Sequence, residues 1–263
     1  MDISRLRAIG RKGGLARFAR YGNLGTPEGR KKGGLNSLKT HNKYNTGFLT
    51  LKKISIPKYS VQLAEFLGII MGDGHVGKYQ VSFVTNSATD LQHALFVKGL
   101  AEQLFKTQAS LSYVRDKKAC SVIISAKRVS AFMEKQGIPQ GNKITLGIHI
   151  PEWVLKNLSY RKALARGLFD TDGCVFVDTH RYKSKEYKSL GIAFTNQSLP
   201  LLHFFNETLE ILELHPTQKS KFRVFLRRRE DIKRYFELID SSNEKHLKKY
   251  RQYFSDLKKG GVA

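Results

Sequence analysis

The sequence predicts a mixed α/β (α+β) fold in which two similar halves follow a basic N-terminal extension, and three observations support this. Two apolar runs of the same form, at residues 66–74 and 165–173, contain small residues and end in Asp-Gly. Patterns typical of strands and helices follow both runs in a similar order. Residues 1–60 hold 14 Lys and Arg against 2 acidic residues, which separates them from the rest of the chain.

Charge is the strongest compositional signal. The 263 residues include 46 Lys and Arg against 22 Asp and Glu, a net charge of +24, yet 41% of them are hydrophobic. A folded protein this basic most often binds nucleic acid, whereas a disordered polycation would lack the apolar residues. Anionic membranes and ribosomes are the rival partners, although no apolar stretch reaches the roughly 18 residues that a membrane span requires.

Cysteine usage bounds the compartment. The two cysteines, Cys120 and Cys174, are far apart in sequence and no Cys/His cluster surrounds them. We interpret them as free thiols in a reducing compartment and predict no zinc site. The protein is therefore expected to be cytoplasmic (in a prokaryote) or organellar, and not secreted.

Each apolar run predicts a helix that ends at an aspartate, Asp73 in the first and Asp172 in the second. Gly74 and Gly173 then stand where a helix favours a left-handed C-terminal residue. A carboxylate at a helix C-terminus faces the negative end of the helix dipole, which is unfavourable by a few tenths to ~1 kcal/mol. A divalent cation shared by the two acids would offset this, because hard cations take carboxylate oxygens.

Small residues suggest how the two helices meet. Gly68 and Gly72 lie four residues apart and so share one helix face, and Gly167 and Thr171 repeat the spacing. Small residues at this spacing let two helix backbones approach closely. If the two helices pack on these faces, the two aspartates lie side by side. The alternative is two unrelated buried helices that end in glycine caps.

Landmarks further along the chain also repeat. Lys143 lies 70 residues beyond Asp73 and Lys245 lies 73 beyond Asp172, and each follows shortly after an Asn. We therefore divide the chain into an extension (1–60), a first half (61–150) and a second half (151–263). The alternative is two independent domains. The expected helices are 61–72, 91–105, 129–136, 160–171, 199–212, 231–239 and 243–254. The expected strands are 79–85, 110–114, 121–125, 174–178, 190–195 and 222–226, with a basic loop at 181–185.

The runs FLGIIMGDG and ARGLFDTDG resemble the two copies of the motif that names the LAGLIDADG homing endonucleases, in the monomeric two-motif type. The resemblance extends from about Val61 to about Phe254. Met71 stands where the family often has an acid, and Asp170 stands there in the second copy; that position is not the catalytic one. The resemblance implies two pseudo-symmetric αββαββα halves, each presenting a curved antiparallel sheet to the DNA major groove.

The same resemblance implies the chemistry. Asp73 and Asp172 match the catalytic, metal-binding acids, and Gly72 and Thr171 are further metal-binding positions. The implied cofactor is Mg²⁺, with Ca²⁺ or Mn²⁺ able to replace it. Phosphodiester hydrolysis needs an activated water and stabilisation of charge on the phosphate, which carboxylate-bound metals supply.

The lysine landmarks are the remaining catalytic candidates. Lys143 and Lys245 match the positions where the family often has a basic residue near the scissile phosphates. Solvated surface lysines beside an Asn cap are the alternative. Asn86 and Asn196, at strand ends near the centre, are candidates for either a turn or a catalytic role. His75 has no second ligand near it in sequence, so we interpret it as a strand residue.

DNA contacts would fall to the sheets. Arg and Lys suit guanine edges and Gln suits adenine, although contact with phosphates is an equally good use of each side chain. The first-half candidates are Lys78, Gln80, Ser82, Arg115 and Lys117. The second-half candidates are Arg181, Lys183, Lys188, Arg223, Arg227 and Arg229.

The N-terminal extension contains an internal repeat. Arg11-Lys12-Gly13-Gly14-Leu15 recurs twenty residues later as Lys31-Lys32-Gly33-Gly34-Leu35, with a turn-rich linker between. Short basic helices interrupted by Gly-Gly suit a segment laid along a phosphate backbone, with Arg11, Lys12, Lys31 and Lys32 as contacts. The alternatives are a disordered basic tail and a mitochondrial transit peptide, against which the repeat and the scarcity of Ser argue.

Together these features predict a monomeric, site-specific, Mg²⁺-dependent double-strand DNA endonuclease, a homing enzyme that is intron-encoded or free-standing. Its partner would be double-stranded DNA with a long target site. An RNA-binding maturase that assists intron RNA splicing, or a non-cleaving DNA-binding regulator on the same fold, are the alternatives. The presence of both motif acids favours the nuclease.

Overall fold

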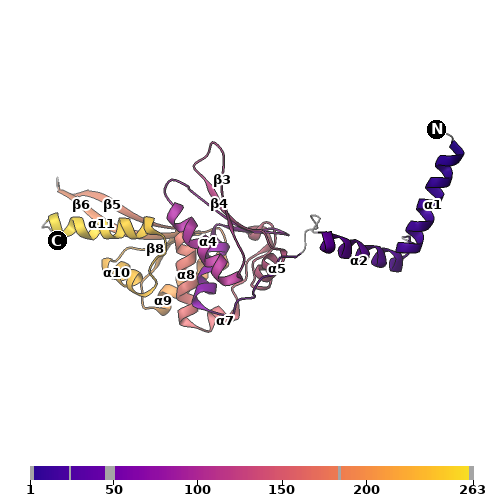
Figure 1. Cartoon of the computed structure of the whole chain (residues 1–263). Coiled ribbons are helices and arrows are strands. Elements are labelled where there is room, and N and C mark those ends of the chain that lie inside the picture. Colours follow the sequence, from indigo (N-terminus) through magenta and orange to yellow (C-terminus); the bar gives the residue numbers. More distant parts are fainter. Residues whose placement is uncertain (1–2, 24, 45–50, 183–184, 261–263) are drawn as a thin grey trace. The chain divides into compact units, whose positions relative to one another are not determined.

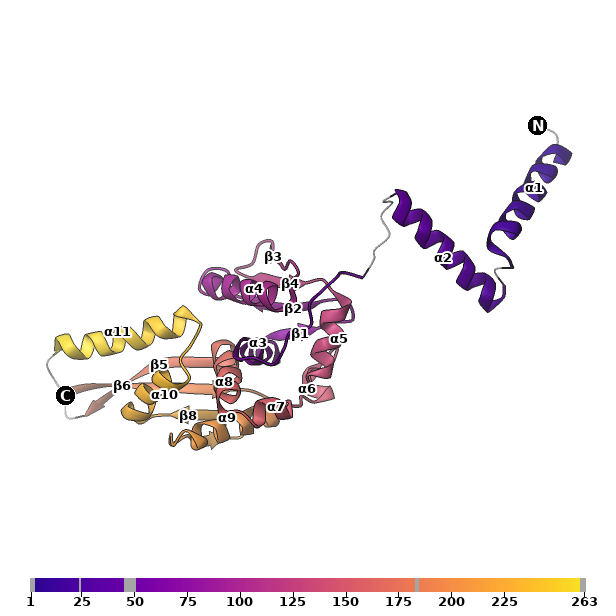
Figure 2. The same cartoon turned by 60° about the horizontal axis from the view of Figure 1, so that its bottom comes forward.

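The computed structural model describes residues 3–23, 25–44, 51–182 and 185–260 (Figures 1 and 2). The chain forms two compact units, residues 1–50 and residues 51–263. We describe each unit by itself. Within the described part of the chain, no helix combines the length and the apolar character needed to cross a membrane.

The N-terminal unit contains two helices, α1 (Ile3–Tyr21) and α2 (Pro27–Tyr44). Both run through their Gly-Gly pair, so they are longer than the short, glycine-interrupted helices that the sequence suggested. Thr26 Oγ1 accepts a hydrogen bond from Gly29 N at the start of α2, and Pro27 occupies a first helical position, where its missing N–H costs nothing. Gly29 is the one buried residue that these two helices contain.

The first half of the core begins with the motif helix α3 (Val61–Gly72), capped by the Ser60 hydroxyl. Its sheet has the antiparallel order β1-β2-β4-β3 and is backed by α4. The elements are β1 (Gly74–Val76), β2 (Val81–Thr85), α4 (Leu91–Phe105), β3 (Ser110–Tyr113), β4 (Cys120–Ile124), α5 (Lys127–Lys135) and α6 (Lys143–Leu146). The short helix α7 (Glu152–Leu155) leads into the second half.

The second half repeats this order. Its sheet, β5-β6-β8-β7, has the same connectivity as the first, so the duplication predicted from the landmarks is confirmed. The elements are α8 (Leu158–Asp172), β5 (Gly173–Tyr182), β6 (Lys185–Thr195), α9 (Leu199–Ile211), β7 (Thr217–Ser220), β8 (Arg223–Leu226), α10 (Arg229–Leu238) and α11 (Glu244–Gly260). The sequence analysis gave bounds for neither β1 nor β7, because strands of three and four residues are too short to show an alternating pattern; in β1 it identified only His75 as a strand residue.

The segment expected to be a basic loop belongs instead to a long hairpin. Strands β5 and β6 stay paired from Gly173–Phe194 out to Tyr182–Lys185, and Arg181 lies opposite Glu186. The prediction of a loop was wrong because it gave weight to charge, whereas Thr179, Tyr182 and Tyr187 beyond the expected strand have the β-branched or aromatic side chains that favour strands. Helix α11 runs along this hairpin (Figure 1). Lys183 lies outside the described residues.

The two motif helices, α3 and α8, pack against each other at the centre of the core (Figure 2). A Cβ atom on Gly68 would lie 2.3 Å from Leu164 O, and one on Gly167 would lie 2.3 Å from Glu65 O. The backbones therefore touch directly, and the predicted face-to-face packing is confirmed. Leu67, Ile69, Leu164 and Leu168 beside this contact are fully buried.

The predicted role of the motif's last glycines was wrong. Gly173 has extended backbone with φ −88°, and Gly74 is not among the residues with positive φ. Neither position has room for a side chain. An added Cβ would lie 2.5 Å from Ile70 Cα at Gly74 and 2.2 Å from Phe169 O at Gly173. The chain turns directly from helix into strand at these two positions.

Residues 51–60 pack on the core. Ser55 N donates to Phe105 O at 2.9 Å, and the Tyr59 ring stacks on Trp153 with centroids 4.4 Å apart. This segment leads the chain into α3 and joins it to the connection between the halves.

Candidate active centre between the motif helices

The C-terminal ends of α3 and α8 meet and bring the two motif acids together. Asp73 is the C-cap residue of α3, and Asp172 is the last residue of α8. A Cβ on Gly72 would lie 2.9 Å from Asp172 Oδ2 and 2.0 Å from Thr171 Oγ1. The Asp172 carboxylate thus reaches over the end of the opposite helix, as the face-to-face packing of the two motifs predicted.

Both acids have raised pKa values. Loss of solvent contact and the charge of Asp73 raise the pKa of Asp172 to about 7, against the opposing effects of Lys143 and Asn196. Loss of solvent contact also raises the pKa of Asp73, while Lys143 and Lys245 lower it. The charged form of both carboxylates is therefore unfavourable, and a cation bound between them would stabilise it.

Lys143 lies between these acids and the end of α3. It is the first residue of α6, whose N-cap Asn142 accepts from Ile144 N and Thr145 N. Its Nζ donates to Ile70 O at 3.2 Å and Gly74 O at 2.8 Å, and also to Gly72 O. Burial lowers its pKa, and Asp172 and Asp73 raise it. The alternative of a solvated surface lysine therefore does not hold for Lys143.

Lys245 has a different environment. It lies in the first turn of α11, and its Nζ is 2.9 Å from Asp90 Oδ1. Its charge lowers the pKa of Asp73, so it belongs to the neighbourhood of that acid. Asp90 escaped the sequence analysis because it precedes α4 as one more polar residue in a turn, with no motif around it.

The two asparagines at the strand ends separate into two roles. Asn196 Nδ2 donates to Asp172 Oδ2 at 2.9 Å, and its Oδ1 accepts from Ser198 N at 2.7 Å. Asn86 Oδ1 instead accepts from Ala88 N and Thr89 N, which is an Asx turn. His75 is a residue of β1, opposite Ser82, as expected.

A buried polar network behind the acids was not predicted. Asp170 Oδ1 accepts from Ser241 Oγ at 2.5 Å and Oδ2 from Ser242 N at 2.9 Å, and burial raises the pKa of Asp170 to about 7. His93 and His246 lie near it, and burial lowers their pKa values to about 4 and about 3. Asp170 was recognised only as the variable acid of the motif.

In the first half, the DNA-contact candidates lie mostly in turns. Ser82 is in β2, opposite His75 and Ile123. Lys78 and Gln80 lie between β1 and β2, and Arg115 and Lys117 lie between β3 and β4. All four of these turn residues are exposed.

In the second half, strand alternation divides the candidates. Arg223 and Phe225 alternate with buried Val224 and Leu226, so they lie on the outer face of β8. The Arg227 guanidinium lies 4.7 Å from the Phe176 ring centroid and 5.1 Å from that of Phe225, and it pairs with Asp178.

The other second-half candidates are placed differently. Arg181 shares a strand face with buried Val175, and Lys188 shares one with buried Leu190, so both lie on the face opposite Phe176. Arg229 begins α10 and is not in a strand, which corrects the expectation. In the N-terminal unit, Arg11, Lys12, Lys31 and Lys32 are exposed on α1 and α2.

Within the described residues, no group of three or more His, Cys, Asp or Glu side chains is arranged to hold a metal ion. Any ion at this centre would rely on the two carboxylates together with main-chain oxygens. The carbonyl of Gly72 accepts a hydrogen bond from the Lys143 ammonium, so an ion that used this oxygen would share it with Lys143 or displace the lysine.

Comparisons with known proteins agree with this fold. Residues 159–252 match a family model described as a LAGLIDADG-like domain. Over 206 residues the chain is 29% identical to the replication factor C small subunit of Methanocaldococcus jannaschii, which covers 71% of this chain and 10% of that protein. The chain spans only 10% to 22% of the length of the curated relatives that it matches.

Two solved structures are similar across most of the core. One is the I-LtrWI LAGLIDADG homing endonuclease bound to target DNA (TM-score 0.51, 15% identity, covering 77% of this chain and 92% of that one). The other is I-SmaMI bound to uncleaved DNA target in the presence of calcium ions (TM-score 0.50, 12% identity, covering 72% and 87%). At these identities the likeness establishes a common fold.

Proposed function

From the premise that residues 159–252 are a LAGLIDADG-like domain and that the core has the fold of the LAGLIDADG homing endonucleases, we propose that this protein is a site-specific double-strand DNA endonuclease. One observation supports this most directly. Asp73 and Asp172 meet at the ends of two packed helices, and a lysine from the other half lowers the pKa of each acid. One chain thus supplies acid and lysine for both strands of a duplex, so the enzyme is active as a monomer.

We propose Mg²⁺ as the cofactor, with Ca²⁺ or Mn²⁺ able to replace it in binding. Asp73 and Asp172 would hold the ion, with the carbonyls of Gly72 and Thr171 as further oxygens, a donor set that suits a hard cation. When bound, the ion would supply Lewis-acid activation of water and neutralise charge on the phosphate. The chain itself fixes the two carboxylates at the helix ends and orients Asp172 through the Asn196 amide.

The decisive experiment is cleavage of a randomised duplex library in Mg²⁺, followed by sequencing of the ends. A defined target with paired cuts is expected, from one protein per duplex in sedimentation. Asp73→Asn and Asp172→Asn are the controls, expected to bind the target in Ca²⁺ but not to cut it. Binding without cleavage by the wild type would favour the regulator, and preference for intron RNA would favour the maturase.

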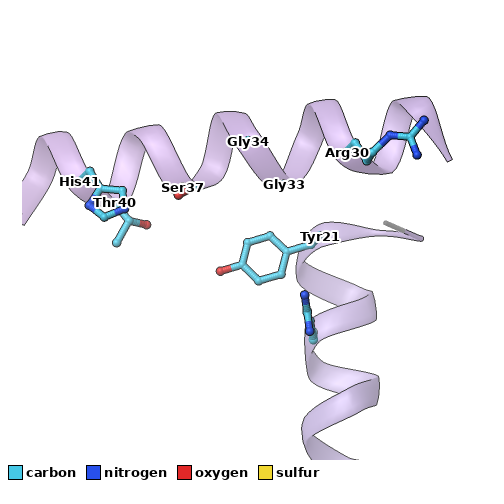
Figure 3. A pocket seen from close by; sticks show the side chains of 8 residues that line it. Tyr21, Arg30, Gly33, Gly34, Ser37, Thr40 and His41 are labelled. Carbon is cyan, nitrogen blue, oxygen red and sulfur yellow. The ribbon is translucent and has the colours of Figure 1, made fainter. Parts of the chain in front are cut away.

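For the N-terminal unit we propose contact with flanking DNA. Residues 3–44 contain 11 Lys and Arg and a single acid, Glu28. A cavity of about 470 Å³ lies between α1 and α2, and Tyr21 points into it toward α2 (Figure 3). Its lining includes the cations Arg17 and Arg30 and the hydroxyls of Ser37 and Thr40, groups that bind phosphate oxygens.

Deleting residues 1–50 tests this contact. Each lost phosphate contact should change the slope of log affinity against log salt by about 0.9, so the truncated protein should bind more weakly with a flatter slope. The cut position should not change at low salt. An unchanged slope would mean that the unit does not contact DNA. A shifted cut would place it in the active centre.

We also propose a reducing compartment, cytoplasmic or organellar, because Cys120 and Cys174 are both free thiols.

A further inference from the structure

Asn243 connects three elements behind the active centre. It precedes α11, and its Oδ1 accepts from Lys245 N at 3.0 Å. Its Nδ2 donates to Asp170 O and to Asp90 Oδ1, both at 3.1 Å. The residue is 2% exposed. A single buried amide therefore ties α11 to the motif helix α8 and to the residue before α4.

Asp90 holds the other end of the same lysine. Its Oδ1 lies 2.9 Å from Lys245 Nζ, and its Oδ2 accepts from Thr89 Oγ1 at 2.7 Å. Asn243 thus fixes the main chain of Lys245 while Asp90 fixes its ammonium group. We call Asp90 and Asn243 the lysine clasp.

Both motif helices support the clasp. The Asp170 carboxylate binds Ser241 and Ser242, just before Asn243. The Ser242 hydroxyl also donates to Glu65 Oε1 at 2.5 Å, and Glu65 is held by Arg166 through two bonds of 2.9 and 2.6 Å. These groups leave the 241–243 segment little freedom, because buried hydrogen bonds of this kind are costly to break.

The described residues of the first half contain no equivalent of the lysine clasp around Lys143. Met71, which corresponds to Asp170 in the motif, is fully buried and apolar. Lys143 Nζ donates to main-chain carbonyls of α3 and β1, and within the described part of the chain it forms no ion pair with a carboxylate. A change in the clasp would therefore act on Lys245 and leave Lys143 in place.

We propose that Asp90 and Asn243 are positioning residues for Lys245, and that through it they control cleavage of one strand of the duplex. The proposal rests on the endonuclease function proposed above. Asn243 bonds the main chain of Asp170, two residues before Asp172, so the segment that carries Lys245 lies at the end of motif helix α8. The Lys245 charge acts on Asp73 there, so the strand cut at the Asp73 side depends on the clasp. The other strand, served by Lys143 beside Asp172, does not.

The test measures cleavage of each strand separately. A target duplex carrying different labels on its two strands is cut by saturating protein in Mg²⁺, comparing wild type with Asp90→Asn, which keeps the size of the side chain. One strand should be cut about tenfold more slowly, as is typical when a positioning partner is lost. The other strand should keep its wild-type rate, so nicked DNA accumulates while affinity in Ca²⁺ is unchanged.

Double variants distinguish positioning from general damage. Asp90→Asn should add no further defect to Lys245→Met, because both act through the same ammonium group. Equal slowing of both strands, an additive effect, or faster cutting by Asp90→Asn would each overturn the proposal.

A folding defect has its own control. Should Asp90→Asn fail to fold by thermal melting, Asn243→Ser takes its place, since Ser still caps α11 but loses both Nδ2 bonds. The same strand should be affected; intact cleavage of both strands would overturn the proposal. A wild type that cuts no target would instead refute the proposed function, and the two failures are thus distinct.

Discussion

Lys143 and Lys245 occupy corresponding places in the two halves, yet their surroundings have little in common. The Lys143 ammonium donates to main-chain carbonyls at the end of α3 and in β1, and the charges of Asp172 and Asp73 both raise its pKa. Lys245 is partly exposed and pairs with Asp90. One topology therefore supports two differently built centres, and the two strands of a duplex would meet different chemistry.

The lysines give the largest expected difference. Lys143→Met should slow cleavage of both strands by about a hundredfold, the scale of losing one electrostatic donor, because its charge reaches both acids. Lys245→Met should slow only one strand by a similar factor. Strand-resolved single-turnover rates measure this. Identical effects of the two variants on the two strands would show that the halves are equivalent after all.

The acids give the next difference, through pH. The pKa of Asp172 is about 7 in the folded protein against 3.8 when unperturbed. Between these values Asp172 is ionised in the unfolded chain and protonated in the folded one, so its contribution to metal-free stability should fall as pH rises from about 4 to about 7 and then level off. The buried His93 and His246, whose pKa values are lowered, contribute in the opposite direction. Cleavage should rise over the upper part of this range, because a divalent cation needs the ionised carboxylate.

Melting temperatures in EDTA at pH 5 and pH 8 test the stability part. Compared with the wild type, Asp172→Asn should shift the change in stability between these two pH values in favour of pH 8, because the penalty for ionising Asp172 is removed. Asp73→Asn should have the same direction of effect, since the pKa of Asp73 is also raised. The same change in stability with pH in the wild type and in both variants would contradict the assignment.

The asparagines give the smallest difference. Asn196→Ala removes the bond to Asp172 and should slow cleavage about tenfold, with little change in affinity. Asn86→Ala removes the Asx turn before α4 and should cost about 1 kcal/mol of stability, as for a helix cap, with cleavage retained. Thermal melting and single-turnover rates on both variants separate the two effects. A cleavage defect in Asn86→Ala that matched the other would give both asparagines one role.

The sequence was sufficient for the motif helices and their packing, because glycines four residues apart define one helix face. It was also sufficient for α4, whose boundaries match the expected 91–105. The β5–β6 hairpin could not be recognised, because the side chains at its tip are polar on both faces, and charge suggested a loop. The strand faces on which Arg181 and Lys188 lie could not be predicted for the same reason, because they depend on the register of the β5–β6 pairing.

The candidate site was recovered only in part, for a related reason. Asp73, Asp172 and the two lysines lie in motifs or at repeated spacings, which one sequence reveals. Asp90 and Asn243 act through contacts between residues 153 positions apart, and nothing in local pattern marks such a pair. The sequence also could not predict that Asn196 bonds Asp172 while Asn86 forms a turn, because this depends on which strand end faces the two acids.

The backbone contact between Gly68 and Gly167 has a consequence for how such a chain could have arisen. Main-chain atoms are the same in every residue, so this contact does not depend on which side chains the partner helix has. The two copies of a duplicated gene could therefore be joined without changing the interface between the motif helices. The hydrogen bonds of Glu65 with Arg166 and Ser242 are different, because they join unlike side chains of the two halves and so make the interface asymmetric. Divergence after fusion could thus accumulate around an interface that neither copy had to change.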